Sequence, residues 1–431
     1  MKLTSLLALS GVAAVLLVYA CKKNDAHPVT RGTTVSADTI HISSPIDSGT
    51  ELIVSEPSGT VLLDTIFSTT TNFRAALSSP LPFVDVTLIQ YYSYSHTYQA
   101  TTYKTVNPST WTSLMPGSYS VPVSKAGYST GDLTYLLSPG NLPIFPRGNG
   151  PNYPDSGIYI SSIADQGPYS MGFSFYNYPP YPIASQYWNY GNYRIFMLWT
   201  ANGLYNFYTP KTLHDTVQDP VMDTAEIIRP VIPAEFNQVI PQVTYINAFM
   251  DTTNFLNSVT LYPTGPDFNS MLTRGLQIPR QPFIQKYELN ILLFGSDSDN
   301  VTFYNYADTV PTVFSLPDQS YYSLNATQAD NFSVSWPKGK PTSYTVTWAT
   351  STVHWSISAS TDSTSLHPLS MFTALHSKLL SGQNLNSLAL LNFSLQTVQG
   401  FDYAGFLGYV CDSMALKTRR VGSLVSYNRT Y

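Results

Sequence analysis

A two-residue alternation of apolar and polar side chains is the feature that most constrains this chain. Apolar residues alternate with polar ones, mostly serine and threonine, in three consecutive segments centred on Val334, Val346 and Trp355. This spacing places the apolar side chains on one face of a β-strand and the polar ones on the other. The segments predict a three-stranded meander with one wet face, whose turns are 337–340 and 349–352.

The composition favours the same fold class for the rest of the chain. Of 431 residues, 43% are hydrophobic, 14% aromatic and only 11% charged, and the chain has 31 prolines. An average globular protein has about 25% charged residues. Helical periodicity is restricted to 403–415. We therefore expect an all-β, multi-domain β-sandwich protein of the immunoglobulin-like kind, with one or two short helices.

Strand signals are also clear near the start of the predicted fold. The apolar runs 52–54 and 61–63 flank a turn at 56–59 that contains proline and glycine, which predicts a β-hairpin. Residues 83–94 predict a long strand, in which Val84, Val86 and Leu88 lie on one face.

The N-terminus has the layout of a lipoprotein signal peptide. Lys2 precedes an almost unbroken apolar run over 3–20, and Cys21 follows directly. No later stretch approaches the roughly 20 apolar residues of a transmembrane helix. We expect residues 1–20 to be removed and Cys21 to be lipidated. The alternative is an ordinary cleaved signal with an incidental cysteine.

Clusters of proline and glycine suggest where domains begin and end. We expect a lipidated flexible tether over 21–37 and a β-sandwich domain over 38–125. An aromatic-rich β domain follows over 126–238. A C-terminal β-sandwich region over 239–431 contains one or two domains.

Cys411 is the other of the two cysteines. If Cys21 carries lipid, Cys411 has no partner for an intramolecular disulfide. It is then either a buried structural cysteine, which we favour, or a lone nucleophile that needs a base and an electropositive setting.

Sequence patterns of catalysis and cofactor binding were not found. Glutamate is too scarce to suggest a glycosidase pair, and the seven histidines show no i,i+4 pair of the zinc-protease type. The chain has no Gly-x-Ser-x-Gly elbow. Its net charge of −5 includes no long run of either sign, which disfavours nucleic acid as a partner. We expect no enzyme activity and no cofactor.

One loop has the side chains of a weak calcium site. Residues 295–300 join the apolar strands 287–294 and 301–306, and the loop contains Asp297, Asp299 and Asn300. Three oxygen-bearing side chains can bind calcium, although a distal bidentate glutamate is missing. The same residues are common in ordinary hairpin loops, so the expected metal content is none.

The segment 153–208 is unusually rich in tyrosine and tryptophan. Flat aromatic rings stack on the C–H faces of sugars, while amides and tyrosine hydroxyls bond sugar hydroxyls. Our preferred glycan-binding positions are Tyr187, Trp188, Tyr190 and Tyr193. The alternative is that these residues fill a strand core, because aromatic residues are favoured in strands generally.

The sequence Val18-Tyr19-Ala20-Cys21 resembles a bacterial lipobox. Together with the polar tether and the domains rich in tyrosine, threonine and asparagine, it makes the chain similar as a class to outer-membrane lipoproteins of Bacteroidota. Seven Asp-(Ser/Thr) triplets also resemble the acceptor motif for protein O-glycosylation in these bacteria, and they begin at Asp38, Asp64, Asp215, Asp223, Asp251, Asp308 and Asp412.

This resemblance implies a protein that is anchored in the outer membrane by its N-terminal lipid and lies at the cell surface. The leading hypothesis is a non-catalytic binder of glycan or another extracellular polymer, comparable to the accessory binders of polysaccharide importers. The alternative is a structural or adhesive, fimbria-like envelope protein without a small-molecule ligand. Its partner is then another envelope protein.

Overall fold

β-Strands make up most of the regular structure in the computed structural model, together with the helices α3 (Pro368–Leu375) and α4 (Tyr403–Cys411). The all-β prediction is confirmed, and α4 lies where the helical periodicity placed it. The structure describes residues 37–42, 46–68, 72–108, 129–136, 157–164, 167–174, 182–190, 195–199, 203–208, 214–218, 223–232, 236, 242–252, 258–262, 275–295, 299–314, 316–317, 321–411 and 420–431. Residues 1–36, with the predicted signal peptide and Cys21, lie outside these ranges.

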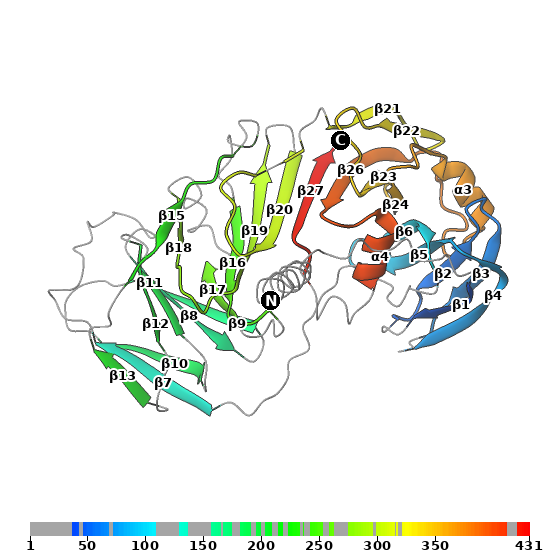
Figure 1. Cartoon of the computed structure of the whole chain (residues 1–431). Coiled ribbons are helices and arrows are strands. Elements are labelled where there is room, and N and C mark those ends of the chain that lie inside the picture. Colours follow the sequence, from blue (N-terminus) through cyan, green and yellow to red (C-terminus); the bar gives the residue numbers. More distant parts are fainter. Residues whose placement is uncertain are drawn as a thin grey trace, which may run out of the picture. The chain divides into compact units, whose positions relative to one another are not determined.

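A twelve-stranded sheet is the largest element of the fold (Figure 1). Its strand order is β17-β16-β19-β20-β27-β26-β23-β24-β6-β5-β2-β3, and all neighbours are antiparallel except β24 and β6. The strands are β2 (Glu51–Ser55), β3 (Val61–Ile66), β5 (Val84–Tyr92), β6 (Thr97–Val106), β16 (Gln242–Phe249), β17 (Ser258–Tyr262), β19 (Lys286–Phe294), β20 (Asp299–Ala307), β23 (Ser343–Ala349), β24 (Val353–Ser360), β26 (Ala389–Val398) and β27 (Ser423–Thr430).

Five smaller sheets complete the described structure. Their strands are β1 (Ala37–Ile42) with β4 (Phe73–Leu81); β7 (Ser129–Leu136) with β10 (Pro182–Tyr190) and β13 (His214–Gln218); β8 (Gly157–Ala164) with β9 (Gly167–Ser174), β11 (Ile195–Trp199), β12 (Leu204–Tyr208) and β14 (Asp223–Thr224); β15 (Glu226–Ile228) with β18 (Leu276–Ile278); and β21 (Ser323–Gln328) with β22 (Asn331–Ser335) and β25 (Ser365–Leu366).

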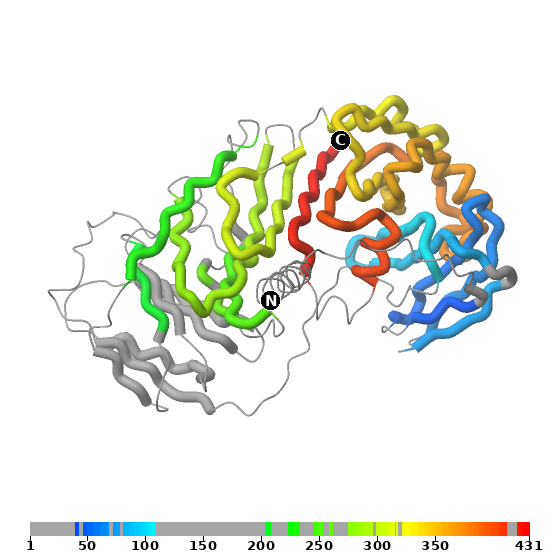
Figure 2. Tube along the Cα trace, in the orientation of Figure 1, coloured from blue at the N-terminus to red at the C-terminus, as the bar shows by residue number. Residues whose placement is uncertain are grey.

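The large sheet joins distant parts of the sequence. Its strands come from residues 51–106 and 242–430, so strands of the first and third predicted domains lie in one sheet. Figure 2 shows the blue and cyan N-terminal strands beside the orange C-terminal ones. The predicted boundaries near 125 and 238 fall outside the described residues and stay predictions.

The predicted hairpins are confirmed, but the predicted meander is wrong in one strand. β2 pairs with β3, β19 with β20, and β23 with β24. β22, however, belongs to the small sheet with β21 and β25. The Phe332 ring of β22 lies 5.4 Å from Trp348 and 6.3 Å from Tyr344, both in β23. The apolar faces of β22 and β23 therefore pack against each other as two layers. If the two strands were neighbours in one sheet, as predicted, they would lie edge to edge and their apolar faces would not face each other.

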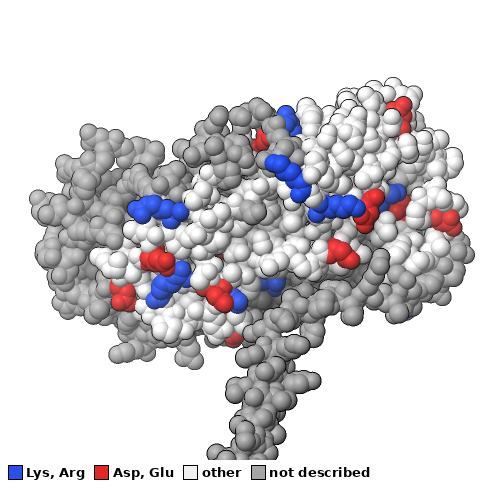
Figure 3. Space-filling view, turned by 45° about the horizontal axis from the view of Figure 1, so that its top comes forward, with Lys and Arg blue, Asp and Glu red and all other residues white. Residues whose placement is uncertain are grey.

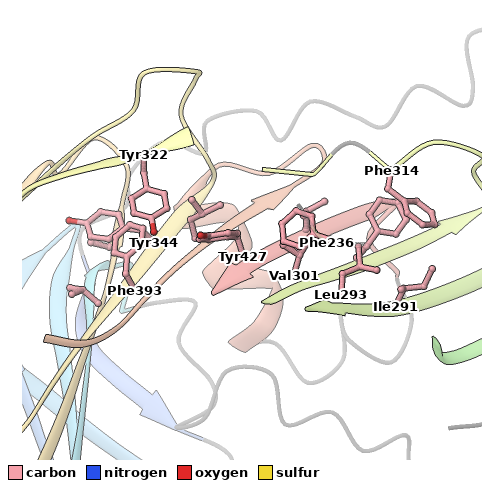
Figure 4. Packing of buried hydrophobic residues seen from close by; sticks show 14 of the residues in the cluster. Phe236, Ile291, Leu293, Val301, Phe314, Tyr322, Tyr344, Phe393 and Tyr427 are labelled. Atoms are coloured by element: carbon pink, nitrogen blue, oxygen red, sulfur yellow. The ribbon is translucent and has the colours of Figure 1, made fainter. Parts of the chain in front are cut away.

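Aromatic side chains fill the interface between these layers (Figure 4). Phe393 of β26 lies 4.5 Å from Tyr322 and 6.0 Å from Tyr344, measured between ring centroids. Trp348 is fully buried, and its indole N–H donates to the Thr327 carbonyl at 3.0 Å. Because this bond satisfies the indole N–H, burying the Trp348 ring leaves no donor without a partner.

A buried carboxylate ties the N-terminal strands to the segment that follows α3. Glu51 of β2 is fully buried, and its oxygens accept bonds from the Ser377 hydroxyl at 2.6 Å and from the backbone N–H groups of Lys378 and Leu379 at 2.7 and 3.1 Å. The Lys378 ammonium also lies 2.7 Å from Asp64 of β3. Charge-assisted bonds of this kind hold together segments more than 300 residues apart.

We predict that Glu51→Ala lowers the free energy of unfolding by about 2 kcal/mol or more, because one buried and two partly buried donors lose their acceptor. Glu56→Gln is the matched control, since the Glu56 carboxylate accepts only an exposed bond from Ser58. Urea unfolding of the full chain, followed by tryptophan fluorescence, measures both variants. Equal midpoints for Glu51→Ala and the unmutated protein would show that the bonds contribute nothing.

Candidate functional site

The preferred aromatic positions lie mostly in one strand. Tyr187, Trp188 and Tyr190 belong to β10, which pairs with β7 and shifts register between Ser185 and Trp188. Tyr193 lies outside the described residues, as do the side chains of the other three. Their role in glycan binding therefore stays a prediction.

The calcium candidates lie at the start of β20. Asp297 is outside the described residues, while Asp299 and Asn300 are the first two residues of that strand. The Asp299 carboxylate is buried, and its oxygen lies 3.6 Å from the Arg429 guanidinium. No group of three or more His, Cys, Asp or Glu side chains gathers among the described residues. Of the two calcium candidates that the structure describes, Asp299 thus directs its carboxylate toward the Arg429 guanidinium.

A shallow groove lies on one face of the β2-β5-β6 part of the large sheet. The strand alternation explains its lining, because every second residue of β5 and of β6 points to this face. Gln90 and Gln99 form a cross-strand pair, as do Leu88 and Thr101. The lining residues are Thr50, Leu88, Gln90, Tyr92, Gln99, Thr101 and Tyr103.

Hydrogen bonds fix one side of the groove. The Tyr92 hydroxyl donates to the side-chain oxygen Oε1 of Gln90 at 3.1 Å, and the side-chain amide Nε2 of Gln90 donates to the Thr50 hydroxyl at 2.9 Å. Gln99 is exposed on the facing strand. Within the described part of the chain, its amide and the Thr101 hydroxyl have no hydrogen-bond partner. The groove therefore combines an oriented amide with groups that can bond a ligand.

Tyrosine rings stand at both ends of the groove. Tyr92 is 38% exposed, next to the β5–β6 turn, where Tyr94 is fully exposed. Tyr103 lies at the inner end, where burial, followed by the nearby Cys411, raises the pKa of its hydroxyl. Tyr103 thus remains a neutral hydrogen-bonding group at any physiological pH.

No side chain that lines the groove carries a formal charge. The ion pair of Lys104 with Asp85, on the same two strands, belongs to the opposite face of the sheet, where Lys104 also contacts Met371 of α3. Over the view in Figure 3, basic and acidic residues of the described chain are scattered and mixed. The groove is thus suited to a neutral, polar ligand.

Sequence reasoning missed this site although its signal was present. It placed Val84, Val86 and Leu88 on one face of a strand over 83–94, and these three residues of β5 lie in one core cluster. Continuing the same alternation to Gln90 and Tyr92, and matching it with Gln99 and Thr101 after the turn, gives the lining. The pairing of these strands was needed to recognise it.

Cys411 lies at the end of α4 and is 1% exposed. It packs with Leu407 of the same helix in a cluster that Tyr103 also contacts. Burial raises the pKa of its thiol to about 12. These observations favour the buried structural cysteine over the nucleophile, because the thiolate is the reactive form.

We predict that a thiol reagent at pH 8 modifies Cys411 slowly in the native chain and rapidly in the presence of urea. The raised pKa keeps the thiolate fraction very low, and burial blocks access. Mass spectrometry of alkylated peptides measures this site separately from Cys21. Rapid native modification of Cys411 would revive the nucleophile hypothesis.

Comparisons with known proteins add no relative to these observations. No protein-family model matches the chain, and a search of curated proteins found no match. Among the helices in the described ranges, none has both the length and the apolar character required to cross a membrane.

Proposed function

We propose that this chain is a non-catalytic, lipid-anchored protein of the cell envelope that binds glycan in the β5–β6 groove. The observation that supports the glycan is the uncharged lining, which combines two tyrosines, two glutamines and two threonines in one concave surface.

The chemistry of each group suits a sugar. Glutamine offers a carbonyl acceptor and an NH₂ donor, and threonine both donates and accepts, as sugar hydroxyls also do. Tyr92 and Tyr103 can place ring faces or edges against sugar C–H groups at the two ends. An anionic or cationic ligand would lose water here without gaining an opposite charge.

The location is proposed from the sequence. Lipidation of Cys21 would anchor the chain in the outer membrane, and a surface-facing orientation would expose the groove to extracellular polysaccharide. This reading rests on the resemblance to outer-membrane lipoproteins of Bacteroidota. The O-glycosylation-like triplets are consistent with the same compartment.

We predict that Tyr92→Ala and Gln99→Ala each weaken glycan binding about three- to tenfold, since each removes a contact worth roughly 1 kcal/mol. Tyr91→Ala is the matched control, because Tyr91 is 48% exposed on the same strand but belongs to the other face. Affinity gel electrophoresis of the full chain in gels containing neutral polysaccharides measures retardation.

A double variant, Trp188→Ala with Tyr190→Ala, tests the aromatic positions of β10 in the same gels. If it alone abolishes retardation, the binding site lies there and the groove assignment is wrong. If no glycan retards the unmutated protein, the binding function fails. Self-association in light scattering would then favour the structural or adhesive alternative.

A further inference from the structure

We propose that the ligand is an extended, uncharged polysaccharide that continues from the groove across the polar face of β24, β23 and β26. This inference rests on the proposed glycan-binding function and specifies the substrate class. It requires that the groove is one end of a longer binding surface.

The strand register supplies that surface. Thr101 of the groove is paired with Ser356 of β24, Ser356 with Thr347 of β23, and Thr347 with Asn392 of β26. Paired residues in adjacent strands point to the same face. A first row of hydroxyl and amide groups therefore leads directly out of the groove, perpendicular to the strands.

A second row runs beside the first. Tyr103 of the groove is paired with Ser358, Ser358 with Thr345, and Thr345 with Ser394. The helix α4 borders this row, because the Tyr403 hydroxyl donates to the Ser358 carbonyl at 2.9 Å. The first row therefore forms the more open part of the surface.

Hydrogen bonds orient the hydroxyls of both rows. Thr347 and Ser356 are 2.8 Å apart between their hydroxyl oxygens, and Thr345 and Ser358 are 2.7 Å apart. All four side chains are partly exposed. Each hydroxyl that bonds its neighbour retains lone pairs or a proton for a ligand, so the groups are fixed before binding occurs.

The dimensions and charge of this surface suit a neutral polymer. Adjacent strands lie about 4.8 Å apart, so the rows span roughly 14 Å from β6 to β26. Every position in the two rows carries a hydroxyl or an amide, and none carries a formal charge. An anionic polysaccharide would place its carboxylates or sulfates where no cation of these rows meets them.

Calorimetry with the purified full chain tests this inference. The probes are neutral gluco-, xylo- and manno-oligosaccharides of two to eight units, with alginate oligosaccharides of equal length as the anionic series. We expect the affinity for a neutral series to rise at least tenfold with length, and the anionic series to bind more than tenfold more weakly.

The double variant Thr347→Ala with Ser356→Ala removes the first hydroxyl pair beyond the groove. We expect it to weaken binding of the longest neutral probe about fivefold and to leave the shortest unchanged, whereas Tyr92→Ala weakens both. Ser333→Ala in β22, a serine of the other sheet, is the control. Matching melting temperatures show that all variants are folded.

The outcomes separate this inference from the function on which it rests. If short probes bind but length brings no gain, or the double variant binds long probes normally, the extended surface is wrong and the groove remains. If alginate oligosaccharides bind as tightly as neutral ones of equal length, the inference that the ligand is uncharged is wrong, but the extended surface remains. If no probe binds the unmutated chain, both proposals fail together.

Discussion

The parallel pairing of β6 with β24 is the contact on which the rest of the structure depends. It is the single parallel junction in the twelve-stranded sheet, and it joins strands that are 253 residues apart at the Thr102–Trp355 hydrogen bond. There the fully buried Trp355 indole donates to the Thr102 hydroxyl at 3.0 Å. Without this junction, the β5–β6 groove and the hydroxyl rows of β24 and β23 would belong to separate sheets.

The chain has few charged residues and many tyrosines, and tyrosine hydroxyls supply part of the polar bonding in its core. In the described core, several tyrosine hydroxyls donate hydrogen bonds to backbone carbonyls. Tyr344 donates to the Ser363 carbonyl at 2.6 Å, and Tyr287 donates to the Pro279 carbonyl. Such a bond needs one neutral donor and one backbone acceptor, so it avoids the desolvation cost of a buried charge pair. The described core also holds buried carboxylates, namely Glu51, Asp85, Glu288 and Asp299. Asp85 pairs with Lys104, and Glu51 and Glu288 each accept bonds from several donors.

Local pattern was enough to predict the strands but not their partners. The alternation in 343–349 and 353–360 predicted the β23–β24 hairpin, because the two strands are adjacent and share a short turn. The same alternation in 331–335 gave a correct strand in a wrong sheet, since an apolar face does not reveal whether it pairs edge to edge or packs face to face. The groove was missed for a related reason, because its lining becomes one surface only when the register of β5 and β6 is known.

The order of strands in the large sheet also determines how this chain must mature. β6 leaves the ribosome about 250 residues before β24, its neighbour in the finished sheet. At about 5–20 residues per second, roughly ten seconds or more pass before that partner has been synthesised. Until β24 has been synthesised, the free edge of β6 offers backbone donors and acceptors to any other chain. Correct folding of this chain therefore requires that the free edge of β6 does not pair with another strand before β24 is available.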